Sequence, residues 1–319
     1  MANPGLSELV TTTLRNRSRQ LADNVTNNNA LFSRLNGKGN LVTIDGGRTI
    51  VEPMEYAENA TFQYYTGYEV LDISPSDVIT AAEFDWKQAS VNVTWSGLEG
   101  EIQNSGREQQ INLIDSRIRV AEKTMANNLS TGAYSDGTGS SGKQVGGLQL
   151  LVPKDPTTGT VGGIDRSTAG GTFYRSQVTT TTALSATNIQ TNMNALWVKT
   201  VRGGDKPDLI PADNNLWQFY LKSLQTVQRF TNDKMASAGF DNLKFMSADV
   251  FFDTGGGCPT NTMFMLNTDF IRLKVHKNRN MTPMDDKVAI NQDASVVPLL
   301  WAGNMTLSNA ARQGHLTNT

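Results

Sequence analysis

The chain of 319 residues contains one cysteine and two histidines. Disulfide scaffolds, zinc ribbons and iron–sulfur clusters need several such ligands, so these classes are excluded. No apolar run approaches the roughly 18 residues that a membrane-spanning helix needs. The first residues show no basic segment followed by an apolar one, so no secretory signal is predicted. We therefore expect the chain to be made in a reducing cytoplasm.

Hydrophobic residues (38%) and charged residues (18%) are both scarce for a globular protein. Their place is taken by 35 threonines and 29 asparagines, which favour strands and loops over helices. The chain is nevertheless expected to fold, because aromatic residues occur along its whole length and the net charge is only −2. Its length allows one large domain or two ordinary ones.

Charge is distributed unevenly along the chain. Residues 39–103 hold eleven carboxylates against two basic side chains, a net charge of −9, whereas residues 1–38 carry +3. One interpretation is an acidic, solvated surface. The other is that copies of the chain meet acidic face to basic face. Neither sign dominates enough to predict a nucleic-acid reader.

The first third of the chain predicts short helices followed by strands. Apolar spacing predicts a helix over 6–24 and another over 30–35, the second ended by Asn36-Gly37. Residues 41–53 contain two β runs around Asp45-Gly46-Gly47, which predicts a hairpin. Residues 82–95 alternate in polarity and predict one long strand with a buried face.

Residues 54–70 are rich in aromatic side chains but lack the apolar runs of a core. The acidic, β-rich segment that contains them is interpreted either as an arm that a partner must order or as the edge sheet of an ordinary β domain. The pattern alone favours neither interpretation.

The strongest helix signal lies in the middle of the chain. Ser105 and Glu108 have the spacing of a capping box, and apolar residues then recur at helical intervals to Leu129. The predicted helix, 104–130, would span almost 40 Å at about 1.5 Å per residue. The glycine- and serine-rich segment 135–147 that follows is predicted to be mobile.

The second half of the chain predicts an α/β lobe followed by further strands. The predicted elements are a helix over 185–202, a buried strand over 207–211, a helix from Asp213 to about Phe230, strands over 245–252 and 263–266, and β-structure over 288–316.

No catalytic, cofactor-binding or metal-ligating residues are predicted. His276 lies in a basic run at 272–279, His315 lies near the end of the sequence, and Cys258 lies in a glycine turn; no nucleophile motif accompanies them. The string GTGSSGK at 137–143 resembles a phosphate loop, but Gln144 replaces the required Ser or Thr. The sequence therefore argues against an enzyme.

Several blocks, taken together and in order, resemble the tailed-bacteriophage major capsid proteins of the Hong Kong 97 fold. The resemblance covers nearly the whole chain. The blocks are VTNNNALF (25–32), GGRTIVEP (46–53), GY (67–68) followed by SPSD (74–77) and FDWK (84–87), NSGRE (104–108), MFMLNTDF (263–270), NQDA (291–294) and LWAGNMT (300–306).

The resemblance implies an α+β chain with the parts of that capsid fold. These parts would be an N-terminal arm (1–38), an extended β-hairpin E-loop with its flanking strand (39–95), a peripheral domain (96–175 and 266–319) with a long spine helix (104–130), and an axial α/β domain (176–265). In such proteins the E-loop lies on a neighbouring subunit, and the basic run at 272–279 is a hypothetical partner for it.

The resemblance also implies a function. The chain would be a structural head protein, not an enzyme, that assembles into pentamers and hexamers of an icosahedral shell around double-stranded DNA. Its partners would be further copies of itself, a separate scaffolding protein, a portal protein and a decoration protein, with no membrane. It would assemble in the host bacterial cytoplasm and reside in the virion. Because residues 41–86 contain no lysine, a lysine–asparagine cross-link from the E-loop is not expected.

Two alternatives stay open. An encapsulin-like compartment would use the same fold to enclose protein cargo. A soluble hydrolase with an unrecognised site would instead exist as a discrete monomer or dimer.

Overall fold

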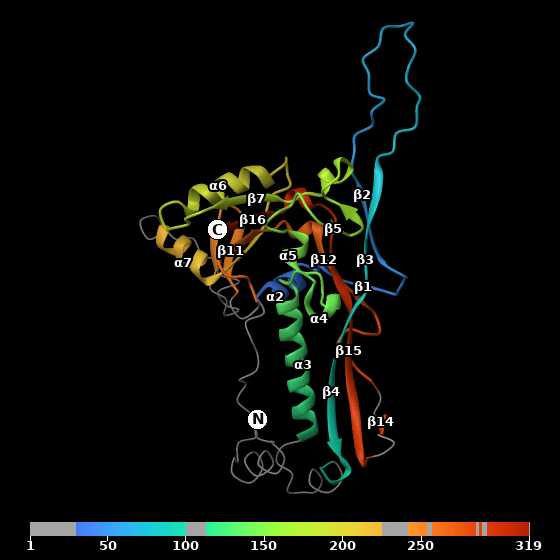
Figure 1. Ribbon diagram of the computed structural model, residues 1–319, viewed down its shortest axis with the longest axis vertical. Coiled ribbons are helices and arrows are strands. Elements are labelled where there is room, and N and C mark those ends of the chain that lie inside the picture. The colour runs from blue at the N-terminus through green and yellow to red at the C-terminus, as the bar shows by residue number, and fades with distance from the viewer. Residues whose placement is uncertain are drawn as a thin grey trace.

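The computed structural model describes residues 30–99, 113–224, 242–253, 257–284, 287–288 and 292–318. The helix predicted over 6–24, the first residues of the helix over 104–130 and the end of the helix reaching Phe230 lie outside these ranges. The described chain forms an elongated body, narrow at one end and broad at the other, from which a long arm projects (Figure 1).

The narrow end is built on a six-stranded sheet in which β15 is the common partner. It pairs antiparallel with β12, β4, β13 and β14, while β1 adds to the other side of β12 in parallel. The strands are β1 (Leu41–Ile44), β4 (Lys87–Ser96), β12 (Ile271–His276), β13 (Thr282–Pro283), β14 (Lys287–Val288) and β15 (Ala294–Leu307).

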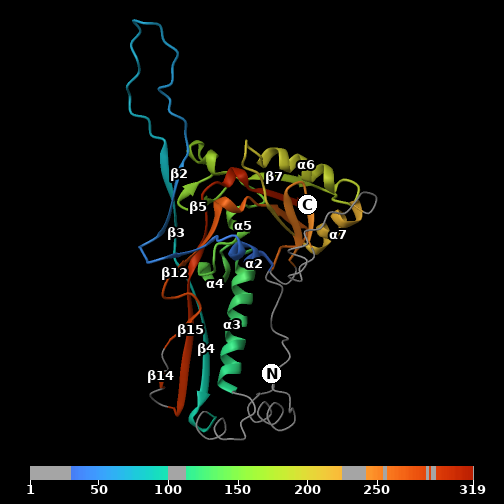
Figure 2. The ribbon, with the colours of Figure 1, turned by 180° about the vertical axis from the view of Figure 1, so that it is seen from behind.

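Helix α3 (Leu113–Gly132) lies along β4 and packs against it (Figures 1 and 2). Its buried stripe is Ala121, Met125 and Leu129, which recur at steps of four residues, so one face of the helix meets the sheet. The predicted long helix is thus present over the described residues and ends at the expected glycine.

The broad end contains a second six-stranded sheet, in the order β7-β16-β11-β8-β10-β9. Helices α6 and α7 pack against it and against each other. The elements are β7 (Gln177–Thr181), α6 (Ile189–Thr200), β8 (Leu209–Ala212), α7 (Asn214–Ser223), β9 (Asn242–Phe245), β10 (Ala248–Phe252), β11 (Thr262–Met265) and β16 (Gly314–Asn318).

The second sheet is buried on both faces, because its residues alternate between two hydrophobic cores. In β11, Met263 and Met265 join the core beneath α6 and α7, while Phe264 joins the core of the first sheet. The two sheets are therefore packed into one body through this strand. This explains why β8 and β11 are apolar without alternation.

Short elements complete the body. They are α2 (Ala30–Gly37), α4 (Gly139–Gly142), α5 (Leu148–Leu151), β5 (Thr160–Val161), β6 (Ile164–Asp165) and the 3₁₀ turns η3 (Ala169–Tyr174), η4 (Thr268–Phe270) and η5 (Ala310–Arg312). The remaining strands, β2 (Ile50–Glu55) and β3 (Ile79–Phe84), form a separate two-stranded sheet.

The hairpin predicted over 41–53 is wrong. β1 pairs with β12, and β2 pairs with β3. The glycine-rich turn between the two β runs is only a local signal. β12, whose side chains alternate between buried and exposed, pairs with β1 in place of the run that follows the turn.

The single strand predicted over 82–95 is two strands. The chain leaves β3 at Asp85-Trp86 and enters β4 in the other sheet. The Asp85 carbonyl accepts a hydrogen bond from Asn304 Nδ2 at 2.8 Å, and Trp86 Nε1 donates to the Gly47 carbonyl at 2.9 Å. These tertiary contacts satisfy polar groups of Asp85 and Trp86 between the two strands. The alternation in the sequence does not reveal such contacts.

Two further predictions also need correction. The strand predicted over 245–252 is the hairpin β9–β10, turned at Met246, whose φ is +52°. The second half of the segment 135–147, predicted to be mobile, is packed: Gly146 N donates to Asn304 Oδ1 at 3.0 Å, and a Cβ on Gly147 would lie 2.4 Å from Ser135 N.

The helices near 30–35 and 185–202 and the buried strand near 207–211 are confirmed as α2, α6 and β8. The range 266–319, assigned to the peripheral domain, does not stay with the first sheet: β16 pairs with β7 and β11 of the second. Such a pairing depends on the return path of the chain after β15, which no local pattern records.

Candidate functional site

The feature that stands apart from the body is the segment 56–78, here called the arm. It connects β2 to β3, projects away from both sheets and contains no helix or strand (Figures 1 and 2). Tyr56 N donates to the Val78 carbonyl at 3.0 Å, which continues the β2–β3 pairing just beyond the strand ends. Past that point the two halves run out from the body as extended chain.

Large hydrophobic side chains of the arm are exposed. Tyr64 is 90% exposed, Tyr68 105% and Ile73 93%, and Phe62, Tyr65, Val70 and Leu71 are also exposed. Each such side chain would gain about 1.5–3 kcal/mol on full burial. This concentration of exposed apolar side chains in one segment makes the arm the candidate binding surface of the molecule.

The arm takes its shape from local contacts. Thr66 and Glu69 close a turn through a backbone hydrogen bond and two bonds to the Glu69 carboxylate. Hydrogen bonds from Ser74 lower the pKa of Asp72 below its usual value. Phe62 and Tyr64 pack edge to face at 5.2 Å. These contacts bend the chain but bury little of it.

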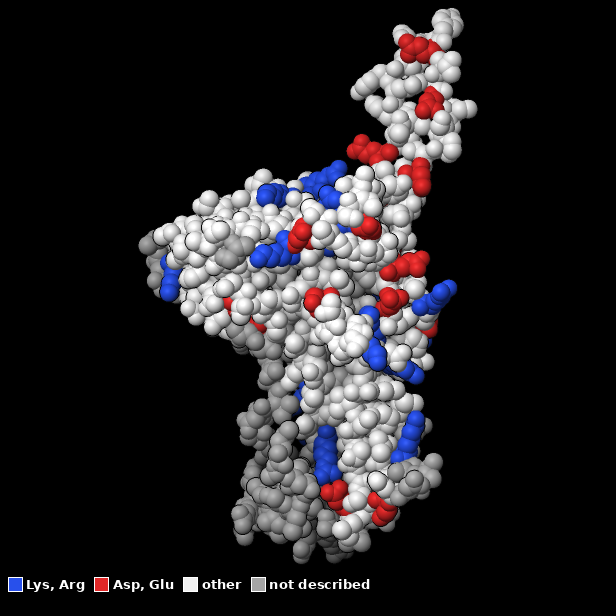
Figure 3. All heavy atoms as spheres, viewed as in Figure 1, with Lys and Arg blue, Asp and Glu red and all other residues white. Residues whose placement is uncertain are grey.

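The arm is also acidic. Residues 49–86 contain no lysine or arginine, and the arm itself carries Glu58, Glu69, Asp72 and Asp77. In Figure 3 the projecting part shows only acidic and neutral side chains, whereas basic side chains gather on the body below it. A surface that receives the arm would therefore be apolar with basic groups at its edge.

The base of the arm, here called the root, is formed by β2 and β3 and is firmly held. Ile50 and Phe84 belong to the first hydrophobic core. Glu83 N donates to the Gly162 carbonyl at 2.9 Å, and Gly162 is so close to the root that a Cβ there would lie 2.7 Å from Ala82. Sequence reasoning did not identify Gly162, because its contact is 80 residues away in the chain.

The basic run 272–279 meets acidic residues of its own chain. Lys274 Nζ lies 2.9 Å from Glu52 Oε1 in a largely buried pair, and Lys277 Nζ lies 3.8 Å from Asp45 Oδ1 in an exposed one. Arg279 donates to Gln88 Oε1 at 3.3 Å. The run thus supports the start of the acidic segment within one subunit, and its pairing with a neighbouring copy stays a prediction.

The histidines and the cysteine have structural surroundings. His276 packs against the Trp86 ring at 5.8 Å. His315 Nδ1 lies 2.8 Å from the Val152 carbonyl, and burial lowers its pKa. Burial beside carboxylates raises the pKa of the Cys258 thiol well above its usual value, which disfavours a thiolate nucleophile. Among the described residues, no group of three His, Cys, Asp or Glu side chains could hold a metal ion.

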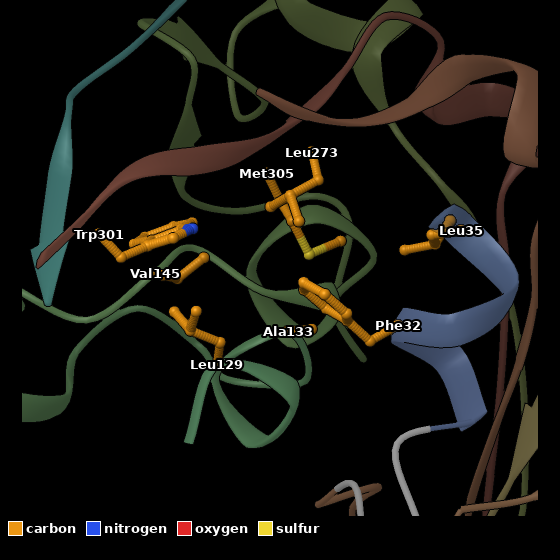
Figure 4. Close-up of a pocket in the computed structure, with 8 residues that line it drawn as sticks. All are labelled: Phe32, Leu35, Leu129, Ala133, Val145, Leu273, Trp301 and Met305. Carbon is orange, nitrogen blue, oxygen red and sulfur yellow. The ribbon is translucent and has the colours of Figure 1, made fainter. Parts of the chain in front are cut away.

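A small apolar cavity of about 10 Å³ lies in the first core (Figure 4). It is lined by Phe32, Leu35, Leu129, Ala133, Val145, Leu273, Trp301 and Met305. A space of this size is no larger than one water molecule and lacks the polar partners that a water needs. It is therefore a packing defect of the first core.

An open groove lies at the root, lined by Pro53, Met54, Glu55, Ile79, Phe270, Ser308 and Asn309. It is continuous with the arm through Glu55 and Ile79. Within the described parts of the chain, none of the helices has both the length and the apolar character needed to cross a bilayer.

Comparisons with known proteins give a consistent result at the level of structure. No protein-family model and no curated protein sequence matches the chain. Solved structures do match along its whole length. The capsid asymmetric unit of cyanophage A-1(L) superposes with a TM-score of 0.68 at 16% identity, covering 100% of this chain and 99% of that one.

Two further matches also cover at least 95% of both chains. The capsid of Myoviridae phage XM1 gives a TM-score of 0.57 at 12% identity, covering 95% of this chain and 96% of that one. The SrpI encapsulin of Synechococcus elongatus PCC 7942 gives 0.61 at 9% identity, covering 100% and 96%. These neighbours are shell components and not enzymes. The chain therefore has the fold of tailed-phage capsid proteins, which an encapsulin shares.

Proposed function

We propose that the chain is the shell-forming subunit of a virus capsid and that its arm lies on a neighbouring copy. The observation that carries this proposal is the arm itself, which exposes Tyr64, Tyr68 and Ile73 almost completely. An isolated subunit has no reason to keep such side chains in water, whereas a neighbouring subunit would bury them. The full-length likeness to capsid subunits supports the same role.

The parts of the molecule then have definite roles. The arm is the E-loop, α3 is the spine helix of a peripheral domain that includes β4 and β15, and the second sheet with α6 and α7 is the axial domain at the centre of each capsomer. The subunits form pentamers and hexamers that close an icosahedral shell. Because the arm is held only at its root, it adjusts to the different neighbours that such a shell requires.

The shell encloses double-stranded DNA and contacts it weakly, since strong phosphate neutralisation would need a large basic excess, and the net charge is −2. Assembly takes place in the host bacterial cytoplasm with a separate scaffolding protein, a portal protein and a decoration protein, and the product is the virion. These partners follow from the proposed role.

Sedimentation velocity and negative-stain microscopy of the expressed chain test this proposal. Closed shells, tubes or capsomers of five or six copies are expected, alone or with the proteins encoded beside it. A species of one or two chains under every such condition would overturn the proposal and return attention to the hydrolase alternative.

A second candidate is an encapsulin-like compartment, which the full-length match to the SrpI encapsulin favours. The contents of shells purified from the natural source separate the two. Nuclease-protected double-stranded DNA supports the capsid, and a single enriched protein cargo without DNA supports the compartment.

A further inference from the structure

The root joins the body without a shared strand ladder. β2 and β3 pair only with each other, so among the described strands no backbone hydrogen bonds run between them and the first sheet. The apolar contacts of Ile50 and Phe84 hold the root in place, but hydrophobic contact is not directional. Directional polar contacts are therefore the best candidates for fixing the angle at which the arm leaves the body; the bond from Glu83 N to the Gly162 carbonyl is one of them, on the β3 side of the root.

A polar cluster occupies this junction. Glu52 Oε1 lies 2.9 Å from Lys274 Nζ of β12 and accepts a hydrogen bond from Thr306 Oγ1 of β15 at 2.7 Å. Lys274 Nζ also donates to the Val51 carbonyl at 3.0 Å. The cluster thus ties a side chain and a backbone group of β2 to two strands of the first sheet.

Both charges are largely out of water: the exposed fraction is 5% for the Glu52 side chain and 11% for that of Lys274. Burying an ion pair is costly, and apolar residues of similar volume often stabilise a fold equally well or better. A buried ion pair whose two groups also form hydrogen bonds to other residues favours one relative orientation of the strands that carry it. The cluster is therefore better suited to orientation than to stability.

We propose that the Glu52–Lys274 pair sets the direction in which the arm projects. Residues beyond Glu55 and Ile79 form an extended lever, so a small rotation at Glu52 becomes a large displacement of Tyr68. Resting on the proposed function, this makes the pair a positioning element that determines where the arm reaches a neighbouring copy.

Direction is measured on unassembled full-length subunits by electron–electron spin resonance distances. One spin label is placed on the arm at Gly67→Cys, where no atom lies within 4 Å of an added Cβ, and one on α6 at Val198→Cys, which is 75% exposed. Cys258→Ser removes the native thiol. The parent gives the reference distance distribution, whose mean reports the direction of the arm and whose width reports its motion about the root.

The decisive variant is Glu52→Met combined with Lys274→Met. It removes both charges, leaves no buried ion unpaired, and leaves Thr306 Oγ1 its second acceptor, the Arg272 carbonyl at 3.3 Å. A melting temperature at or above that of the parent is expected, with a broader and shifted distance distribution. A distribution identical to that of the parent would overturn the proposal, because packing alone would then orient the arm.

Lys277→Met is the matched control. It removes one lysine charge from the residue directly after β12, where Lys277 and its partner Asp45 have side chains that are 70% and 88% exposed. Both the melting temperature and the distance distribution should stay unchanged. A broadening equal to that of the double variant would show a general charge effect and would also overturn the proposal.

Assembly gives a separate measurement. Shells of the double variant should be heterogeneous in diameter by electron microscopy, and shells as uniform as those of the parent would overturn the role of the pair in reaching a neighbour. A parent chain that never assembles would refute the proposed function alone, since the distances are measured on single subunits.

Discussion

The β4–β15 pair of the first sheet, here called the ribbon, and the arm with its root both extend far along the molecule, yet they differ in what covers them. β15 pairs with β4 along all 10 residues of β4, and Leu299 and Trp301 are buried in the first core, to which Met125 and Leu129 of α3 also belong. The arm loses its pairing beyond the six residues of β2 and has no helix against it. A long ribbon is ordered when its own chain supplies a cover, and the arm lacks that cover.

The composition of the two regions follows this difference. The ribbon places Val93, Leu299 and Trp301 toward the protein interior at alternate positions of their strands. The arm exposes aromatic side chains without alternation. The arm therefore carries apolar surface that the subunit itself leaves exposed, and under the proposed function a neighbouring copy covers it.

The largest expected effect comes from removing this surface. Tyr64→Ser, Tyr68→Ser and Ile73→Ser together should raise the concentration needed for assembly more than about tenfold, because each buried side chain contributes about 1.5–3 kcal/mol. The free energy of unfolding of the subunit should change by less than about 0.5 kcal/mol, since these positions are exposed.

Sedimentation velocity measures the first quantity and urea denaturation the second. Val198→Ser, at an exposed position on α6, is the control and should alter neither. Shells formed by the triple variant at the concentration that suffices for the parent would refute the intersubunit role of the arm.

The converse change in the ribbon should affect the subunit. Trp301→Ala removes a side chain that is 1% exposed and enlarges the cavity that it lines (Figure 4). A loss of about 3–5 kcal/mol in the free energy of unfolding is expected in urea denaturation. Leu98→Ala, at a half-exposed position beyond β4, should cost far less, and equal losses for both would contradict the assigned core.

A smaller effect is expected at the root. Gly162→Ala combines a φ of +59° with a Cβ that would lie 2.7 Å from Ala82, whereas Gly163→Ala has a φ of +76° and open space. Both substitutions are destabilised by the positive φ, but only Gly162→Ala also crowds the root. Its loss in the free energy of unfolding should therefore be about 1–3 kcal/mol larger. Thermal unfolding of the two variants measures the difference; equal melting temperatures would show that the root yields without cost.

The smallest expected effect is a pH dependence. Burial lowers the pKa of His315 in the folded chain, so the unfolded chain binds the proton more readily. The contribution of this group to stability is present above its unfolded pKa of about 6.5 and is lost as the pH falls below it. Unfolding free energies at pH 7.5 and 5.5 should differ less in His315→Gln than in the parent. If instead His315→Gln keeps that dependence unchanged, another group is responsible for it.

Much of the local structure was predictable from the sequence. The stripe of Ala121, Met125 and Leu129 forms the buried face of α3, because apolar residues that recur every three or four positions lie on one face of a helix and that face packs against the core. Uninterrupted apolar residues likewise predicted β8 as a fully buried strand. The scarcity of histidine and cysteine led to the prediction that the chain has no catalytic residues, which stays a prediction.

The candidate site was only partly predictable. The absence of core-like runs and the clustering of aromatics left an arm and an edge sheet equally open. The strands of the root were assigned to the wrong partners, since Ile50 pairs with Phe84, on the far side of the arm in the sequence. The Glu52–Lys274 pair joins residues more than 200 positions apart. One sequence contains no signal for such a contact, because a charge pattern does not specify which opposite charge folding will bring near.

The sequence by itself determined the main described helices and the fully buried strand β8, because these properties depend on side chains within a few residues of one another. The tertiary structure decided which strands pair. It placed β1 beside β12, divided the 82–95 segment between two sheets and carried β16 into the second sheet. Strand pairing depends on where the chain returns in space, and the energy of a ladder is nearly the same for many partners until packing selects one.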